Sequence, residues 1–223
     1  MKDNKKISVI IPTLNEEKNM PILLKKIPDY VDEIIVIDSH SKDKTVEVSE
    51  KHGANVYLVG KGKGRAIIKG VKESSGDYVI IVDADLSHDP KEIELFISAL
   101  NIGNDLCLGS RFIQGGGSED ITFIRKIGNK FFIKFINFLF RKRFTDVCYG
   151  YRAFKRDSFN KLNLKASGFS IEVELIIKAI KKNMNIIEIP SYEKERKYGK
   201  TKLNSITDGL KILKEIFICY FKY

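Results

Sequence analysis

The segment VIIVDADLSHDP, Val79 to Pro90, joins an apolar run to a group of acidic residues. The apolar run is rich in valine and isoleucine, as is typical of a strand that is buried on both faces. Because side chains alternate along a strand, we expect Asp83 and Asp85 to point the same way beyond its carboxyl end, close enough to hold one divalent cation. Asp89 precedes Pro90 and is typical of a helix N-cap. The segment therefore predicts a buried strand that ends in a candidate metal site.

Short apolar runs alternate with longer helical patterns over the first half of the chain. The runs are ISVIIP, EIIVID, NVYLV, YVIIVD and DLCLG, and the helical patterns between them are EEKNMPILLKKI, KTVEVSEKHG, GRAIIKGVKESSG and PKEIELFISALN. This alternation predicts an α/β fold with a mostly parallel sheet flanked by helices. Ligands in such sheets bind at the carboxyl ends of the strands, where the polar residues 13–16, 38–41 and 83–85 all fall. Their convergence favours a ligand site over simple capping.

The composition limits the class of protein. A hydrophobic fraction of 43% in 223 residues is ordinary for a soluble protein with a proper core. The net charge of +10 suits nucleic acid, an anionic membrane surface or phosphorylated small molecules, and does not choose among them. Cys107, Cys148 and Cys219 are too scattered for a disulfide framework or a zinc site. The charged residues 1–6 do not resemble a secretory signal, so we expect a cytoplasmic location.

Residues 121–144, ITFIRKIGNKFFIKFINFLFRKRF, combine aromatic and basic side chains. Large apolar residues recur there at helical spacing beside a stripe of lysines, namely Ile127, Phe131, Phe135 and Phe138 with Lys126, Lys130 and Lys134. Such a stripe is often core, but this composition is also typical of a helix that lies on anionic lipid. Neither this segment nor ITDGLKILKEIFICYFKY has the ~20 uninterrupted apolar residues that a spanning helix needs. We therefore expect peripheral contact with a membrane.

Seven segments, in order from Ile7 to Leu203, carry a resemblance to a known family. They are ISVIIPTLNEEKN, VIDSHSKDKT, GKGKGRAIIKG, GDYVIIVDADLSH, GSRFIQGGG, DVCYGYRAF and ERKYGKTKL. Together they resemble the inverting family 2 glycosyltransferases of the GT-A fold, in the dolichol-phosphate (polyprenyl-phosphate) mannosyl- and glucosyltransferase branch. The resemblance implies one glycosyltransferase domain over residues 1–223, with a nucleotide-sugar-binding half, 1–112, and an acceptor- and membrane-facing half, 113–223. It also implies hexose transfer to a polyprenyl phosphate, with inversion.

The same resemblance implies where a nucleotide sugar of the GDP-mannose or UDP-glucose type binds. Leu14 stands where the branch usually has tyrosine. Ser39 replaces an aspartate, and a hydroxyl cannot accept the paired hydrogen bonds that a carboxylate offers to a guanine edge, so the base stays open. The GKGKGRA loop matches glucosyltransferases as well, so mannose and glucose both stay open. The implied nucleotide-sugar-binding residues are Pro12, Leu14, Glu16, Ile37, Asp38, Ser39, Lys63, Asp83, Ala84, Asp85, Ser87, Arg196 and Lys202.

The resemblance makes Asp83 and Asp85 the holders of Mg²⁺ or Mn²⁺ on the diphosphate, where the cation neutralises the leaving group of an oxocarbenium-like reaction. An ionised phosphate acceptor needs no strong general base. Asp85 is the first candidate for a catalytic residue and Glu172, which also fits a helix-surface acid, is the second. Arg111 and Arg125 match the family's arginines near the acceptor phosphate, although each also fits a plain surface charge.

Three other functions fit parts of the pattern. A nucleic-acid-binding module would explain the charge, but the uniformly apolar strands leave no exposed sheet for bases, so we expect no nucleic-acid partner. A sugar-nucleotide pyrophosphorylase would have a glycine-rich loop directly after the first strand, where this chain has PTLNE. A glycosyltransferase with a glycan or small-molecule acceptor stays open as the alternative.

Overall fold

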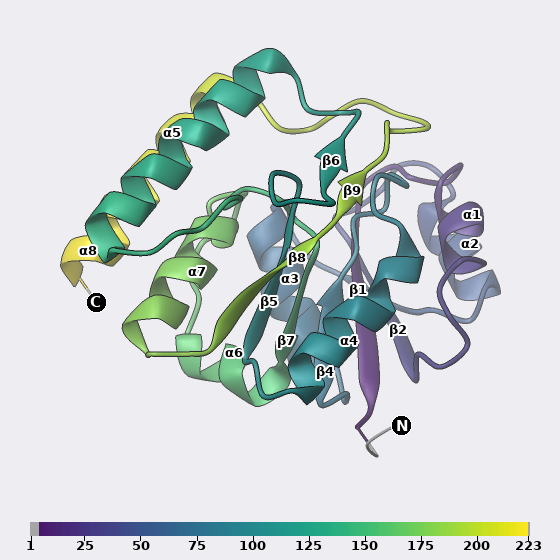
Figure 1. Ribbon diagram of the computed structural model, residues 1–223. Coiled ribbons are helices and arrows are strands. Elements are labelled where there is room, and N and C mark those ends of the chain that lie inside the picture. The colour runs from purple at the N-terminus through teal and green to yellow at the C-terminus, as the bar shows by residue number, and fades with distance from the viewer. Residues whose placement is uncertain (1–4, 223) are drawn as a thin grey trace.

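The computed structural model describes residues 5–222 and contains a seven-stranded sheet in the order β3-β2-β1-β4-β7-β5-β8 (Figure 1). All neighbouring strands are parallel except β7, which is antiparallel to β4 and β5. The predicted mostly parallel sheet is thus confirmed. The strands are β1 (Ile7–Thr13), β2 (Glu33–Asp38), β3 (Asn55–Leu58), β4 (Tyr78–Ile81), β5 (Leu106–Ser110), β7 (Arg152–Lys155) and β8 (Ile186–Pro190).

Helices cover both faces of this sheet. Along β1, Ile10 packs into the core on one face, while Val9 and Ile11 pack into the core on the other, and all three are fully buried. Burial on both faces is why the strands read as continuous apolar runs. One face is covered by α3 (Lys63–Glu73), α6 (Arg156–Leu162) and α7 (Ile171–Lys181), and the other by α1 (Met20–Leu24), α2 (Thr45–Lys51) and α4 (Ile93–Asn101), which follows a 3₁₀ turn at Pro90–Glu92.

The antiparallel strand β7 shapes the edge of the sheet that was predicted to bind a ligand. Ile81 at the end of β4 and Leu108 in β5 both pair with Arg152, the first residue of β7. The residues that precede Arg152 therefore emerge beyond the carboxyl ends of β4 and β5. This arrangement brings Tyr149 and Gly150 to the carboxyl edge of the sheet.

Two long helices, α5 (Phe123–Phe140) and α8 (Ser205–Lys222), lie side by side outside the sheet layers (Figure 1). Their inner residues, such as Ile136 and Ile216, are fully buried against the core on the α7 side. Ring contacts between Phe135 and Phe217 join the two helices. A two-stranded sheet of β6 (Gly117–Ser118) and β9 (Tyr192–Glu193) lies near the N-terminal ends of the helices.

The predicted aromatic stripe on α5 divides between two environments. Ile127, Phe131 and Phe138 are 54%, 52% and 80% exposed, whereas Phe135 is partly buried against Phe217. Part of the Phe135 ring is thus covered by α8, while the other three side chains of the stripe are largely exposed. Within residues 5–222, no helix is long and apolar enough to cross a membrane.

Close backbone packing makes a glycine necessary where α3 begins. A Cβ atom on Gly64 would lie 2.0 Å from the carbonyl oxygen of Ala166, in the loop before α7. We predict that Gly64→Ala destabilises the fold by about 1–3 kcal/mol, lowering the Tm by roughly 2–12 °C, because the loop must shift. Gly168→Ala is the control, since its Cβ would meet nothing within 4 Å. Equal Tm values for the two variants in calorimetry would contradict this account.

Candidate active site

A cavity of about 200 Å³, the strand-end cavity, lies at the carboxyl ends of β1, β2 and β4. Most of the residues predicted to bind a nucleotide sugar line it, namely Pro12, Leu14, Glu16, Ser39, Lys63, Asp83, Ala84, Asp85, Arg196 and Lys202. Thr13, Gly62, Ala66, Phe169 and Thr201 complete the lining. The structure therefore brings together residues that are up to 190 positions apart in the sequence.

Three predicted residues do not line the strand-end cavity. Ile37 is fully buried in the core. Asp38 is also fully buried, and its carboxylate accepts hydrogen bonds from the Thr13 hydroxyl, at 3.0 Å, and from the Ser41 backbone, at 2.7 Å. Asp38 thus orders the loop after β2. Ser87 lines the neighbouring cavity instead.

That second cavity, the helix-side cavity, has a volume of about 250 Å³ and lies between the end of the sheet and the helices α5 and α8. Arg111 and Arg125, the predicted acceptor-phosphate residues, line it together with Asn129, Tyr149 and Glu172. The two cavities share a set of residues where they meet, namely Lys63, Asp83, Asp85, Phe169, Arg196 and Thr201. A molecule in one cavity can therefore reach a molecule in the other across these carboxylates and cations.

Lys63 binds Asp83 at this junction. The Lys63 ammonium lies 2.8 and 2.9 Å from the two carboxylate oxygens of Asp83 and 3.2 Å from Glu172 Oε1. Burial would raise the pKa of Asp83, but Lys63 lowers it to about 2, so Asp83 stays ionised above that pH. Burial would likewise lower the pKa of Lys63, but Asp83 and Glu172 raise it above its ordinary value. A Cβ atom on Gly150 would lie 2.4 Å from the Lys63 nitrogen, so only glycine leaves room for this ion pair.

Asp85 has its own polar partners. Its Oδ2 atom lies 2.6 Å from Arg196 Nη2, and its Oδ1 atom accepts hydrogen bonds from the backbone and hydroxyl of Ser87, at 3.0 and 2.6 Å. Each carboxylate of the pair thus has a cationic side chain beside it, which offsets the repulsion between the two negative charges.

His88 contacts both the backbone and the carboxylate of Asp83. It was not predicted as a site residue. It is 2% exposed and stacks on Tyr151 at a ring distance of 4.5 Å. Its Nδ1 atom accepts a hydrogen bond from the Asp83 backbone, at 3.1 Å, so the proton of the neutral ring is on Nε2, 3.7 Å from Asp83 Oδ2. His88 therefore holds the Asp83 backbone in place and lies beside its carboxylate. Its position three residues after Asp85 is the only signal of this in the sequence.

Glu172, in the first turn of α7, is buried and not a helix-surface acid. It is 5% exposed, and its Oε2 atom lies 2.9 Å from the guanidinium of Arg152. With Lys63 on its other side, Glu172 connects the charged residues of the junction to the start of β7. Phe169, which precedes α7 and lines both cavities, was also missed, because an isolated phenylalanine in a loop carries no pattern.

The two predicted arginines of the helix-side cavity differ in their partners. The Arg111 side chain is 8% exposed and makes ion pairs with Asp146, at 2.7 Å, and Glu193, at 3.1 Å. Arg125 Nη2 donates to the hydroxyl of Thr201, at 2.8 Å, whereas its Nε atom is buried without a partner among the described residues. Arg125 thus has a free donor, while Arg111 already contacts two carboxylates.

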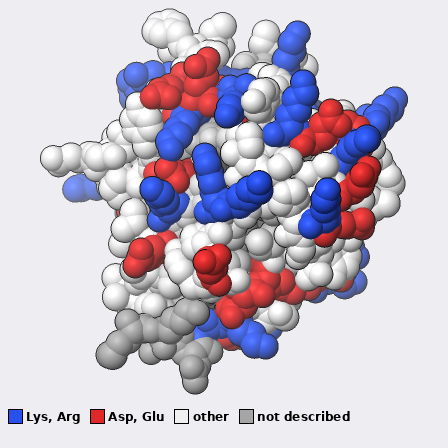
Figure 2. Space-filling view, turned by 90° about the vertical axis from the view of Figure 1, so that its right-hand side faces the viewer, with Lys and Arg blue, Asp and Glu red and all other residues white. Residues whose placement is uncertain are grey.

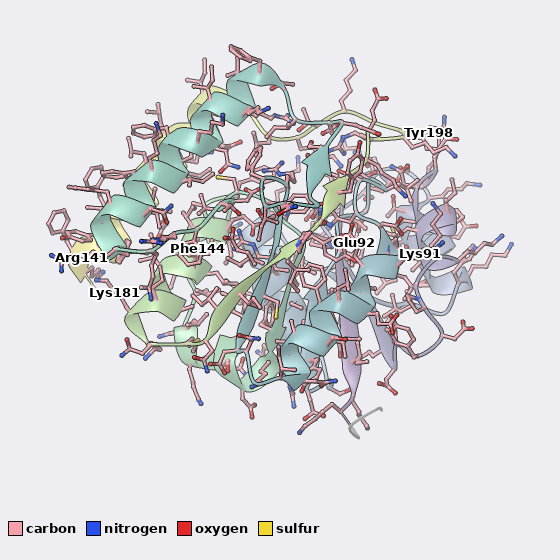
Figure 3. All side chains as sticks on the ribbon, in the orientation of Figure 1. Lys91, Glu92, Arg141, Phe144, Lys181 and Tyr198 are labelled. Atoms are coloured by element: carbon pink, nitrogen blue, oxygen red, sulfur yellow. The ribbon has the colours of Figure 1, made fainter. Side chains whose placement is uncertain are left out.

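Residues 194–204 form a segment that covers the strand-end cavity. Arg196 reaches Asp85, and Lys202 lies 2.8 Å from Glu16 Oε1. The carbonyl of Tyr198, at the outer bend of this segment, accepts a hydrogen bond from Asn19 at 3.4 Å (Figure 3). These contacts hold the segment against the residues that line the cavity.

The donor set of the junction fits a hard divalent cation. Asp83 and Asp85 present carboxylate oxygens, the ligands that Mg²⁺ and Mn²⁺ prefer. Within residues 5–222, no group of three or more His, Cys, Asp or Glu side chains is arranged to hold a metal ion. A protein site with few carboxylates suits a cation that takes its other ligands from substrate phosphates and water.

Comparisons with known proteins identify the family of this chain. Residues 8–162 match the family model "Glycosyl transferase family 2". The chain is 35% identical over 214 residues to dolichol-phosphate mannosyltransferase of Pyrococcus furiosus, which covers 91% of this chain and only 60% of that protein. It is also 31% identical over 218 residues to glycosyltransferase AglJ of Haloferax volcanii. That match covers 95% of this chain and 71% of AglJ.

Solved structures confirm the fold. Glucosyl-3-phosphoglycerate synthase of Mycobacterium tuberculosis, in complex with Mn²⁺, uridine diphosphate and phosphoglyceric acid, superposes with a TM-score of 0.78 at 22% identity. The match covers 97% of this chain and 79% of that chain. The same enzyme has also been solved with Mg²⁺ and uridine diphosphate.

The different partners of the two aspartates predict different effects on stability. We expect Asp83→Asn and Asp85→Asn each to reduce kcat by on the order of 100-fold or more, because even changes around metal ligands cost about 10–100-fold. Only Asp83→Asn should also lower the Tm, since it weakens the binding of the buried Lys63 ammonium. Asp157→Asn, on the exposed first turn of α6, is the control. Wild-type turnover in both variants would rule out the assignment.

Proposed function

Because the chain belongs to glycosyl transferase family 2, we propose that it transfers a hexose from a nucleotide sugar to a polyprenyl phosphate, with inversion at the anomeric carbon. The observation that carries this proposal is the meeting of two cavities at Asp83 and Asp85. One cavity collects the residues expected for a nucleotide sugar. The other is lined by the guanidinium groups of Arg111 and Arg125 and by residues of the two amphipathic helices α5 and α8.

The nucleotide sugar, of the GDP-mannose or UDP-glucose type, occupies the strand-end cavity in this proposal. Its base lies near Leu14 and Ser39, and its diphosphate lies at the junction. Arg196 and Lys202 then exchange their carboxylate partners for phosphate oxygens, which a guanidinium and an ammonium both bind well. The segment 194–204 thereby closes over a charge that it helps to neutralise.

Asp83 and Asp85 would hold the Mg²⁺ or Mn²⁺ ion, which when bound neutralises the charge that develops on the leaving diphosphate. Lys63 keeps Asp83 ionised and in place for this role. When Arg196 turns to the diphosphate, Asp85 Oδ2 is released while Oδ1 keeps its hydrogen bonds from Ser87, so we assign Asp85 to the cation and not to proton transfer.

The state of the carboxylates supports an acceptor that is already ionised. Among the described residues that line the helix-side cavity, every carboxylate has a cationic neighbour: Asp83 and Glu172 have Lys63, Asp85 has Arg196, Asp120 has Arg125, and Glu193 has Arg111. With Asp85 assigned to the cation once Arg196 binds the diphosphate, none is left as a free general base for a hydroxyl group. A phosphate oxygen needs none, because it carries a negative charge and attacks directly.

Arg125 is the proposed anchor of the acceptor phosphate, because its Nε atom has no partner in the part of the chain that the structure describes. Arg111 holds Glu193 at the wall of the same cavity and pairs with Asp146, which does not line it. In the reaction, an acceptor oxygen forms a bond to the anomeric carbon as the bond to the diphosphate breaks. Entry of the acceptor from the opposite cavity suits a single displacement with inversion.

The proposed acceptor also requires contact with a membrane surface. Phe123 and Phe138 on α5 and Phe221 on α8 are 77%, 80% and 78% exposed. Arg141 and Lys181 lie at one end of this helix pair (Figure 3). Exposed aromatic side chains with nearby cations are the features of a helix surface that binds anionic lipid.

A transfer assay with Mn²⁺ tests the function. We expect labelled hexose from GDP-mannose or UDP-glucose to pass to a polyprenyl phosphate, and Arg125→Ala to raise the KM for that acceptor by on the order of tenfold or more. Arg125→Lys should recover part of the loss. The structural neighbours act on phosphoglyceric acid, so it serves as the competing acceptor. Transfer to phosphoglyceric acid and not to the lipid would refute the proposal in favour of a phosphorylated small molecule.

Sedimentation with anionic vesicles tests the membrane contact. We expect the wild-type protein to co-sediment at low salt and less at high salt, because salt screens the attraction of lysine and arginine for the surface. Ile127→Ser with Phe138→Ser should weaken sedimentation without changing nucleotide binding. The matched control is Leu95→Ser with Ile102→Ser, which removes two exposed apolar side chains from α4 and from the residue that follows it. Wild-type protein that stays in the supernatant would exclude this contact.

A further inference from the structure

We infer that the isoprenoid chain of the acceptor leaves the helix-side cavity between the N-terminal halves of α5 and α8, past Gly128 and Gly209. This inference rests on the proposed function and adds a binding site for the apolar part of the substrate. The cavity reaches from the charged junction to the space between the two helices. Its apolar lining there consists of Ile121, Ile124, Phe132, Leu203 and Ile212.

Both glycines lie in the interior of a helix, and each faces open space. A Cβ atom on Gly128 would meet nothing within 4 Å, and one on Gly209 would meet only the tip of Phe132, at 4.0 Å. Neither residue has the positive φ that favours glycine. Glycine weakens a helix interior relative to alanine, so backbone geometry and close packing do not explain these two residues, unlike Gly64 and Gly150. A side chain at either position would instead narrow the cavity.

The two helices contact each other through rings farther along. Phe135 and Phe217 lie 5.4 Å apart, and Phe140 and Tyr220 lie 5.7 Å apart, between ring centroids. These contacts are toward the C-terminal ends of α5 and α8. The glycines that line the cavity therefore lie nearer the N-terminal ends of the two helices than these ring contacts do.

The passage is polar at its inner end. Arg125 contributes its unpartnered Nε atom there. Asn129 is 4% exposed, and its Nδ2 atom donates to Asp146 at 2.7 Å, which fixes the orientation of the amide because a carboxylate only accepts. Its buried Oδ1 atom has no hydrogen-bond partner among residues 5–222.

The passage is apolar at its outer end. Ile124 lines the cavity and is also 68% exposed, while Ile206 and Leu210, near the start of α8, are 74% and 64% exposed. A site that is charged inside and apolar at the surface fits an amphiphile with an anionic head and a hydrocarbon chain. Among phosphate acceptors, this combination of a charged inner end and an apolar outer end favours a prenyl phosphate over a sugar phosphate or a phosphorylated carboxylic acid.

Acceptors of different chain length test the passage. We expect Gly128→Leu and Gly209→Leu to lower the ratio of kcat/KM for a long polyprenyl phosphate to that for a single-isoprene phosphate by on the order of tenfold, because the added side chain occupies the path of the long chain. The Kd for the nucleoside diphosphate with Mn²⁺ should match that of the wild type. Glu94→Leu, which adds the same side chain at an exposed position of α4 outside the cavity, should leave the ratio unchanged.

Each outcome separates this inference from the proposed function. A wild-type enzyme that uses long prenyl phosphates, with an unchanged ratio in both leucine variants, would overturn the passage and keep the function. A wild-type enzyme that uses no prenyl phosphate would overturn both. If a leucine variant does not fold, Gly128→Ala gives the same test with a smaller side chain, and we expect it to raise the Tm while lowering the ratio in the same direction.

Discussion

The buried ammonium of Lys63 is the contact on which the site depends. It joins the start of α3 to Asp83 beyond β4 and to Glu172 in α7, and Glu172 in turn pairs with Arg152 in β7. Four elements are thus held at one point by alternating charges. Each buried charge is tolerated only because its neighbour is present, since a buried ion without a partner is strongly destabilising. These ion pairs hold the residues shared by the two cavities in fixed positions relative to one another.

Much of the fold and part of the site could be predicted because the signals are local. The five apolar runs became β1 to β5, and the polar residues that follow β1, β2 and β4 meet at one edge, as parallel strands require. The antiparallel strand β7 gave no such signal, because its sequence RAFK has a charged residue at each end in place of an apolar run, and its direction is set by neighbours far along the chain. The first expected helix is also shorter than its pattern, covering only Met20–Leu24.

The side-chain chemistry of the site was harder to predict. That Asp38 is used within its loop, and that Arg111 is bound by two carboxylates, follows from contacts with Ser41, Asp146 and Glu193 that no spacing reveals. The net charge of +10 likewise did not indicate where a basic surface would lie. On the face that Figure 2 shows, basic and acidic side chains are interspersed, so no broad basic surface is present on that side. The cations that matter for the site lie inside it.

The parallel arrangement of α5 and α8 has an electrostatic consequence. Both helices begin at the helix-side cavity, where Ser205 at the start of α8 and residues at the start of α5 form part of the wall. Backbone dipoles along each helix give its first turn a partial positive charge and its last turn a partial negative charge. The two helices therefore raise the potential of the cavity together, in the same sense as Arg125. At their other ends, Arg141 and Lys222 carry the opposite sign to the terminal carbonyls, so the pair has its negative poles compensated and its positive poles directed at the place where an anion would bind.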